Sequence, residues 1–319
     1  MSRAIHNLLK QSAGLLASLL FIVLTENTSA QVPHLPATNL GLANIDDGIT
    51  PGPGFYYVNF TQDYQGNSWK DGLGHNIPTN LRVNSYFTIH QFIYVSKVKV
   101  FSGYLTYTAL IPIVRLSASD NSAPAPTVNP NVLGDIIFGP AIVWQNKHFL
   151  GMPLFHRAEV DLIIPTGAYS SRYEINPGAH LYTISAHYTF TCYLTKGFSI
   201  SMRNHLDYNT KILGTEAKPG IFYHVNYSFA QTIYKNFRAE ACGYYLSQVQ
   251  QDSYNGDEHY YQEKYGIPDT RERVFAYGPG LSFLANSRLL IEGKAFVETA
   301  VKNREEGVKY ALQLAYKFN

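Results

Sequence analysis

The feature that most constrains the fold is an alternation of apolar and polar residues with a period of two, clearest in the C-terminal segment. One set of residues there is wholly apolar or aromatic: Val308, Tyr310, Leu312, Leu314, Tyr316 and Phe318. The intervening set is mixed: Lys309, Ala311, Gln313, Ala315 and Lys317. Successive side chains of a β-strand point to opposite faces, so this segment is predicted to be a strand with one apolar face.

The same alternation recurs from residue 54 onward, in segments of about ten residues bounded by tyrosines. About twelve such segments begin near Phe55, Leu81, Val98, Leu133, Leu154, Leu181, Phe198, Ile221, Phe237, Arg271, Arg288 and Val308. Short connections, as at Ser96–Lys97 and Lys196–Gly197, alternate with long ones. This rhythm is typical of outer-membrane barrels, with short periplasmic turns and long external loops. We therefore predict an all-β fold, a transmembrane antiparallel β-barrel of about 12 strands over residues 54–319.

Two Gly-Pro pairs complicate the strand count. Gly139–Pro140 and Gly278–Pro279 both fall inside proposed strands. Pro lacks the N–H that a ladder hydrogen bond needs, so each pair marks either a bulge or the end of a shorter strand. The number of strands is accordingly 10 or 12.

The N-terminus carries the pattern of a secretory signal peptide. Arg3 and Lys10 precede an apolar stretch from Ala13 to Leu24, and small residues follow before Gln31. This apolar stretch is well short of the ~20 residues that a spanning helix needs. We expect residues 1–30 to be removed by cleavage near Ala30 and the chain to reach the bacterial outer membrane. Residues 31–53, Pro-rich and without a period, are expected to form a periplasmic or plugging segment.

The composition of the chain limits the kinds of molecule that it can bind. Charged residues make up 15% of the chain, the formal net charge is +2, and the 25 Tyr equal the 25 Lys plus Arg. No basic excess exists to neutralise phosphates, which excludes nucleic acid as a partner. An apolar outward face predicts contact with outer-membrane lipid, and many of the tyrosines are expected at the membrane interfaces. The aromatic-ended terminal strand predicts recognition by the outer-membrane barrel assembly machinery.

Several short motifs together resemble the outer-membrane transporter family named after the MetA-pathway of phenol degradation. They are Asn39 to Asn44, Asp47–Gly48, Pro51 to Tyr56, Leu133 to Asp135, Ile164 to Gly167, Ile175 to Gly178, Asn204 to Lys211, Gly243 to Leu246 and Lys264 to Ile267. The resemblance covers nearly the whole chain after the signal peptide. It implies a single-chain outer-membrane barrel linked with uptake of aromatic or other hydrophobic compounds.

Residues opposite the apolar faces are predicted to line the lumen. The candidates are Arg82, His90, Arg157, Glu159, Asp161, Arg203, His205, Asp207, His224, Asn226, Glu292 and Lys294. Both charge signs are present in rough balance, whereas a charge-selective pore would be expected to carry a ring of one sign. Each of these charges is either part of a permeation path or simply paired to stiffen the wall, because buried charges require partners.

The hairpin from Ser199 to Ala230 permits a prediction of register. A turn centred near Gly214 places Ser201 opposite Ser228, Arg203 opposite Asn226, and His205 opposite His224. A slip of one residue would set polar against lipid-facing groups, so the pattern itself resists slippage. We expect this polar ladder to form part of the permeation path.

Other chemistries find less support. Ser201, His205 and Asp207 have the residue types of a catalytic triad, but on one strand they lie too far apart to form a relay. No H-x-x-x-H pair occurs, so neither a metal nor a cofactor is expected. External-loop tyrosines, notably Tyr254, Tyr260 and Tyr261, are candidates for stacking on aromatic rings.

The sequence therefore predicts an outer-membrane channel for passive uptake of small hydrophobic or aromatic solutes, and not an enzyme. The first alternative is an enzyme that modifies outer-membrane lipid. The second is a structural or adhesive barrel that transports nothing and binds a partner through its loops. Conductance in planar bilayers separates the channel from both alternatives, and phospholipid hydrolysis identifies the enzyme.

Overall fold

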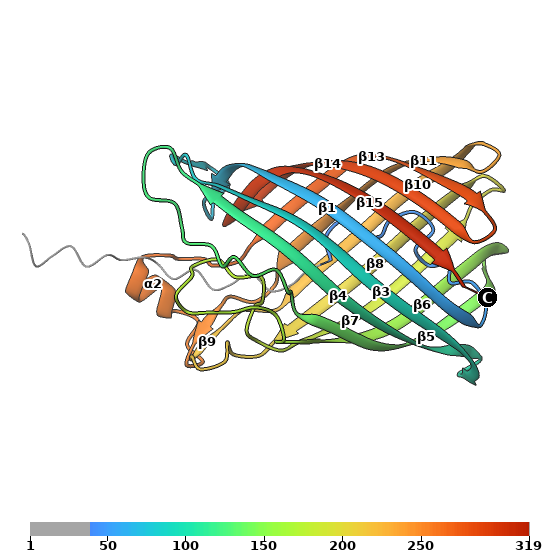
Figure 1. The fold of residues 1–319 in the computed structure, drawn as a ribbon, viewed down its shortest axis with the longest axis horizontal. Coiled ribbons are helices and arrows are strands. Elements are labelled where there is room, and N and C mark those ends of the chain that lie inside the picture. The colour runs from blue at the N-terminus through green and yellow to red at the C-terminus, as the bar shows by residue number, and fades with distance from the viewer. Residues whose placement is uncertain (1–38, 319) are drawn as a thin grey trace, which may run out of the picture.

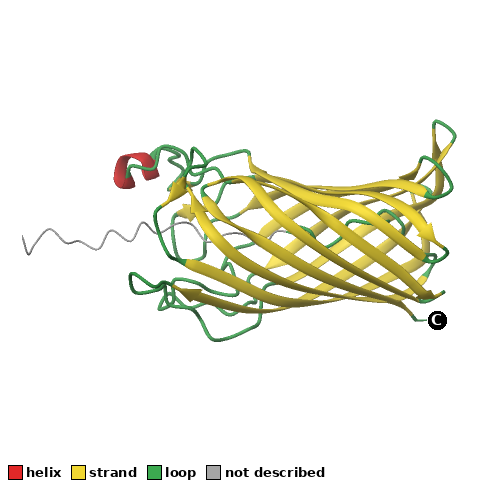
Figure 2. Cartoon of the chain, turned by 90° about the horizontal axis from the view of Figure 1, so that it is seen from above, coloured by secondary structure: helices red, strands yellow, loops and turns green. Residues whose placement is uncertain are grey.

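The computed structural model describes residues 39–318 as a closed antiparallel barrel (Figures 1 and 2). Its strands are β1 (Gly54–Lys70), β3 (Arg82–Val100), β4 (Gly103–Ser119), β5 (Ile136–Phe149), β6 (Met152–Ile164), β7 (Thr183–Tyr193), β8 (Phe198–Asn209), β10 (Phe222–Tyr234), β11 (Phe237–Gln248), β13 (Arg273–Asn286), β14 (Leu289–Lys302) and β15 (Arg304–Lys317). β15 pairs with β1 from Lys317 opposite Tyr56 to Arg304 opposite Lys70, which closes the sheet. Closure gives every strand of the described wall a neighbour on both sides. The predicted all-β barrel is confirmed, with twelve strands in its wall among the described residues.

The Gly-Pro pairs interrupt pairing on one side only. Pro140 lies opposite Tyr107 of β4, but on the β6 side pairing stops at Phe138 and resumes at Ala141. Pro279 likewise lies opposite Ala241 of β11, while pairing with β14 skips from Tyr277 to Gly280. Each missing donor therefore costs a local gap in one ladder. The strands continue through these gaps, which decides for twelve strands over ten.

The connections differ at the two ends of the barrel, which we call the turn end and the loop end. Short connections gather at the turn end with the C-terminus, and the loop end carries β9 (Ala217–Lys218), β12 (Ser253–Tyr254) and α2 (Tyr260–Tyr265) (Figure 1). The short β2 (Asn76–Ile77) pairs with the last residues of β1. Among residues 39–318, no helix has the length and apolar character needed to cross a membrane.

One predicted turn is wrong. Ser96 and Lys97 lie within β3, where the register with β4 shifts between Val95 and Lys99. The chain reverses instead at Phe101 and Ser102, both of which adopt positive φ. Two consecutive residues with positive φ match the right-handed twist of a tight hairpin, so the turn lies there although neither residue is a Gly.

The wall alternates between outward apolar and inward buried side chains. In β7, for example, Ile184 and Tyr188 are exposed, whereas Thr183, Ser185 and His187 are buried. Residues 39–53, which precede β1, contribute further buried side chains, including Leu40, Leu42 and Asn44. We call residues 39–53 the inner segment. The predicted signal peptide, residues 1–30, lies outside the described residues, as do residues 31–38 of the predicted N-terminal segment.

Candidate functional site

The inner segment lies inside the barrel and is held by the lumen-facing side chains of many strands. The Gly41 N–H donates to Asn226 Oδ1 at 2.8 Å, and the Asn44 amide donates to Tyr227 O at 3.0 Å and Gly243 O at 2.9 Å. Lys294 Nζ donates to Leu42 O at 2.8 Å and to Asn44 Oδ1 at 3.0 Å. The backbone polar groups of a buried segment require partners, and here the wall supplies them.

At Gly48 the backbone of the inner segment lies directly against the wall. Its N–H donates to Thr191 Oγ1 at 2.9 Å, and a Cβ added at Gly48 would lie 2.6 Å from Phe155 O. Since the obstructing atoms include strand backbone, a side chain at this position would push the inner segment off the wall. The close contact with the wall thus explains why a glycine follows Asp47.

Two consecutive carboxylates anchor the same stretch. Asp47 accepts a two-pronged contact from Arg203, with Nε to Oδ2 at 2.6 Å, and faces Arg157 Nη2 at 3.8 Å. Asp46 pairs with Arg238 and accepts from the Tyr193 hydroxyl at 3.1 Å. Burial by itself would raise the pKa of Asp47, but the guanidinium groups of Arg203 and Arg157 outweigh it and hold the pKa below its usual range.

The opposite side of the inner segment is apolar and contacts another part of the wall. Leu42 and Ala43 pack with Val58 and Phe60 of β1 and Ile89 of β3. The inward residues of β3 that meet this side of the inner segment, Phe87 and Ile89, are therefore apolar. His90 lies on the outward face with Tyr86 and Tyr94, as the register with β1 requires, so its predicted place in the lumen is wrong. The physical reason is that the inner segment covers apolar inward residues of this strand. Arg82 lies beyond the residues that pair with β1, and its predicted place in the lumen stays a prediction.

The other lumen candidates lie on the inward face: Arg157, Glu159, Asp161, Arg203, His205, Asp207, His224, Asn226, Glu292 and Lys294. The predicted hairpin register is confirmed, since Ser201 lies opposite Ser228, Arg203 opposite Asn226, and His205 opposite His224. Whether these side chains line a permeation path stays a prediction.

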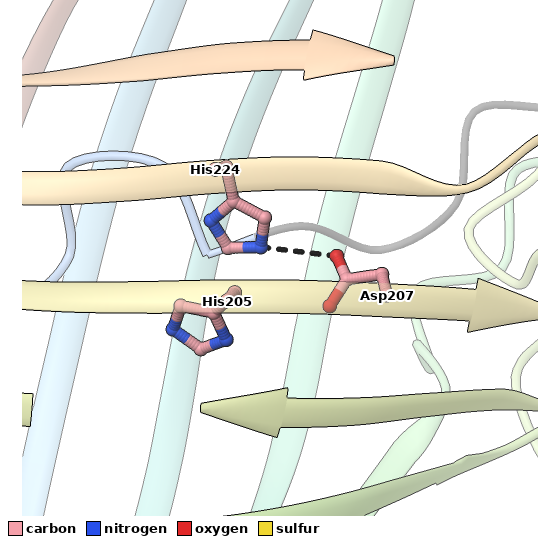
Figure 3. Close-up of side chains that lie close together, drawn as sticks. All are labelled: His205, Asp207 and His224. Carbon is pink, nitrogen blue, oxygen red and sulfur yellow. Dashed lines mark hydrogen bonds and ion pairs between the residues drawn. The ribbon is translucent and has the colours of Figure 1, made fainter. Parts of the chain in front are cut away.

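Three histidines of adjacent strands stack along this wall. The ring centroids of His187 and His205 are 4.5 Å apart, and those of His205 and His224 are 4.2 Å apart. His187 was missing from the sequence-based candidates, although its place between Ser185 and Thr189 already assigns it to the polar face of its segment. His187 Nε2 contacts the carboxylates of Glu159 at 3.2 Å and Asp161 at 3.3 Å, and His224 Nε2 contacts Asp207 at 3.0 Å (Figure 3).

A cavity of about 450 Å³ lies at the loop end of the lumen, and we call it the outer cavity. Its apolar lining comes chiefly from the inner segment and from β1, β3 and β4: Leu40, Trp69, Val83, Phe87, Val114 and Leu116. Its charged lining comprises Asp135, Glu174, Glu272, Arg304, Glu305 and Lys309. Burial raises the pKa of Glu272 to about 7, against the opposing effect of Arg304, whose Nη1 lies 3.3 Å from the carboxylate.

The predicted loop tyrosines do not line the outer cavity. Tyr254 and Tyr260 stack on each other with centroids 4.3 Å apart, and Tyr260 meets Tyr261 edge to face at 5.3 Å. Lys264 Nζ donates to the Tyr260 hydroxyl at 2.8 Å. These rings pack as a cluster around α2, so binding of a solute by them stays a prediction.

Comparison with known proteins assigns this chain to a family. The model of the "MetA-pathway of phenol degradation" family matches residues 36–314. The chain belongs to this family. No curated protein matches its sequence.

Solved structures agree with the fold of this phenol-degradation family member. An outer membrane channel from Pseudomonas putida F1 superposes with a TM-score of 0.72 at 13% identity, covering 87% of this chain and 100% of that chain. The transport unit of the autotransporter AIDA-I from Escherichia coli gives 0.46 at 10% identity, covering 87% and 94%. A mutant of the monoaromatic hydrocarbon channel TodX gives 0.47 at 9%, covering 85% and 92%. The first likeness shows a shared fold, and the other two are too distant to add to it.

A catalytic relay does not form among the described residues of this family member. Ser201 Oγ contacts Thr191 Oγ1 at 2.8 Å, and no His contacts it. Ser185 Oγ does contact His205 Nδ1 at 3.0 Å, but Asp207 pairs with His224 instead of His205. A Ser-His-Asp relay requires the acid and the serine on the two nitrogens of one ring, a condition that these contacts do not meet.

Proposed function

We propose that this protein is a passive channel of the bacterial outer membrane for small hydrophobic or aromatic solutes, working without nucleotide or cofactor. The observation that carries the proposal is the outer cavity, which opens at the loop end and has a largely apolar lining. Pockets of this size enclose small organic molecules and orient them with a few polar groups. Here the charged residues of the lining, such as Arg304 and Lys309, are suited to a hydroxyl or other polar substituent on a ring.

The affinity expected for such a solute is weak, as a channel requires. A buried aromatic ring removes on the order of 150–250 Å² from water. At ~25 cal/mol per Å² this corresponds to roughly 4–6 kcal/mol before the cost of immobilising the solute. Since ~4 kcal/mol corresponds to a dissociation constant of about 1 mM, the expected net binding is in the millimolar range or weaker, which lets the solute enter and leave again.

Passage from the outer cavity towards the turn end has to go past the inner segment. Leu40 contributes to the cavity and is also tied to the wall, since Lys309 Nζ donates to Leu40 O at 3.0 Å. Transport therefore requires the inner segment to shift within the lumen or to guide the solute along its apolar side, past Leu42 and Ala43.

The proposed location of the protein is the bacterial outer membrane. The signal peptide over residues 1–30, cleaved near Ala30, would deliver the chain for export. The apolar outward face would contact outer-membrane lipid, and the assembly machinery would recognise β15. Separation of the membranes after expression, with N-terminal sequencing of the mature protein, tests both the compartment and the cleavage site.

The direct test fills the outer cavity. Val114 faces the cavity and its neighbour Ile113 faces outward, so Val114→Trp and Ile113→Trp add the same bulk to opposite faces of β4. Uptake of toluene or phenol into proteoliposomes should fall severalfold in Val114→Trp and stay near the wild-type rate in Ile113→Trp. Equal uptake by all three proteins would contradict the proposed role of the cavity. Phospholipid hydrolysis by the purified wild type would support the enzyme instead.

A further inference from the structure

We propose that His205, Asp207 and His224 form a binding site for a divalent transition-metal ion, with Zn²⁺ as the probe. His205 and Asp207 are two residues apart on β8 and so share its inward face, and His224 lies directly opposite His205 on β10 (Figure 3). One ligand atom from each of the three side chains lies within 4.8 Å of the other two. Two residues at i and i+2 with one cross-strand neighbour place three ligands around one point on a sheet.

The geometry needs a modest adjustment to reach coordination distances. Zn–N and Zn–O bonds of ~2.0–2.2 Å put the ligand atoms of a tetrahedral site roughly 3.4 Å apart. His224 Nε2 and Asp207 Oδ2, at 3.0 Å, already meet this condition, and the ion would replace the proton that they share. The His205 ring lies nearly parallel to the His224 ring, at 12°, so it must turn about its side-chain torsions to direct a nitrogen at the ion.

Unsatisfied buried atoms point to a ligand at this place. His205 Nε2, Asp207 Oδ1 and His224 Nδ1 have no hydrogen-bond partner among the residues that the structure describes. The three residues are only 4%, 1% and 1% exposed. A buried polar atom without a partner destabilises the folded protein, and coordination by His205 Nε2 and Asp207 would relieve part of that cost.

One contact already prepares His205 for this role. Its Nδ1 lies 3.0 Å from Ser185 Oγ of the neighbouring strand β7. With a metal ion on Nε2, the Nδ1–H group donates to that hydroxyl once the ring has turned, which sets the tautomer. Ligating histidines commonly use their second nitrogen in this way.

The neighbouring group of Glu159, Asp161 and His187 is a poorer candidate, although its ligand atoms are equally close. His187 Nε2 already contacts both carboxylates, and Arg157 Nε lies 2.9 Å from Glu159. Protein cations therefore already compensate the two negative charges. No Lys or Arg forms an ion pair with Asp207 within residues 39–318, so its charge remains available to an ion.

The donor set selects the type of ion. Two imidazoles and one carboxylate suit Zn²⁺, Cu²⁺, Ni²⁺ or Fe²⁺, whereas Mg²⁺ and Ca²⁺ prefer oxygen ligands throughout. The sequence offered no H-x-x-x-H pair, because these ligands meet across two strands and not along one helix. The site stands independently of the proposed transport function.

The test uses the full chain, purified in detergent and freed of metal with a chelator. Isothermal titration at pH 7.5 should show one Zn²⁺ bound per chain, and His205→Ala, His224→Ala and Asp207→Asn should each weaken binding at least ~10-fold. Bound Cu²⁺ should give an electron paramagnetic resonance spectrum with two nitrogen ligands. Affinity should fall between pH 7.5 and pH 5.5, because protons compete for the imidazoles.

His90→Ala and His187→Ala are the matched controls. His90 faces outward with its Nδ1 2.6 Å from the Tyr57 hydroxyl, so its removal should leave the affinity unchanged. His187→Ala should change the affinity less than about threefold, and a larger loss than in His205→Ala would overturn the assignment. Heat-modifiable migration on a detergent gel checks that each variant is folded. Absence of Zn²⁺ binding to the wild type, or unchanged binding in all three ligand variants, would also refute the site.

Discussion

Two walls of the same barrel face the same inner segment with opposite chemistry. The charged wall consists of the inward residues of β6, β7, β8 and β10, among them Arg157, Arg203 and the stacked histidines. The apolar wall consists of the inward residues of β1, β3 and β4 around Phe60 and Ile89. Both walls alternate with a period of two. What differs is the part of the inner segment that each one meets: Asp46 and Asp47 face the first, and Leu42 and Ala43 the second.

This difference shows that the interior of a barrel is not polar by default. An inward position needs polar residues where it meets water or charge, and apolar residues where another segment covers it. The inner segment is amphipathic and imposes its own two sides on the wall. The following predictions test this division, beginning with the largest expected effect.

Breaking the contact on the charged wall should have the largest effect. Asp47→Ala leaves Arg203 and Arg157 without their partner in the inner segment, and removing one member of a buried ion pair costs ~3–5 kcal/mol. The loosened segment should also raise single-channel conductance in planar bilayers. Glu263→Ala, which removes an exposed carboxylate from α2, is the control and should change neither stability nor conductance. Conductance unchanged in Asp47→Ala would show that Asp47 does not hold the segment in place.

The stability of the protein should depend on pH through Glu272 at the outer cavity. Its pKa is raised from 4.5 to about 7 by burial, despite the proximity of Arg304. The folded state thus binds this proton more tightly, so the stabilisation is complete below about pH 4.5 and is lost as the pH rises through 7. In Glu272→Gln, which stays neutral, the unfolding temperature should fall less between pH 5.5 and pH 8.5 than in wild type. Glu263→Gln, at an exposed position of α2, should behave as wild type.

The smallest effect is expected outside the apolar wall. His90→Ala removes one contact with the Tyr57 hydroxyl on the outward face, so the loss of stability should be about 1 kcal/mol or less. Conductance and its pH dependence should match wild type. His205→Ala and His224→Ala, on the charged wall, should alter the pH dependence of conductance. A pH response that is lost in His90→Ala would return His90 to the lumen and reject the outward placement.

Much of the fold could be predicted because it depends on local alternation. The pairing of His205 with His224 follows from one turn and one pattern, since a slip of one residue would bury polar groups in lipid. The inverted strand β3 could not be read in the same way. Its inward residues include Phe87 and Ile89, and its outward set includes His90, so polarity by itself pointed to the wrong face.

The candidate sites show the same limit. Arg203 and Asp207 were assigned inward correctly, but the partner of Arg203 is Asp47, 156 residues away in a segment without any period. The group of His205, Asp207 and His224 combines residues of two strands. The outer cavity is lined by residues of the inner segment, several strands and a loop. No spacing within the sequence predicts these contacts between distant segments.

The sequence by itself determined that this chain forms an antiparallel barrel, because a period of two separates an apolar outward surface from an interior over almost every strand. Only the tertiary structure decided what that interior contains. It places residues 39–53 inside the barrel, with their carboxylates on one wall and their apolar side chains on the other. The physical reason is that alternation records which face of a strand points out of the barrel, whereas interior contacts join residues whose distance along the chain carries no period.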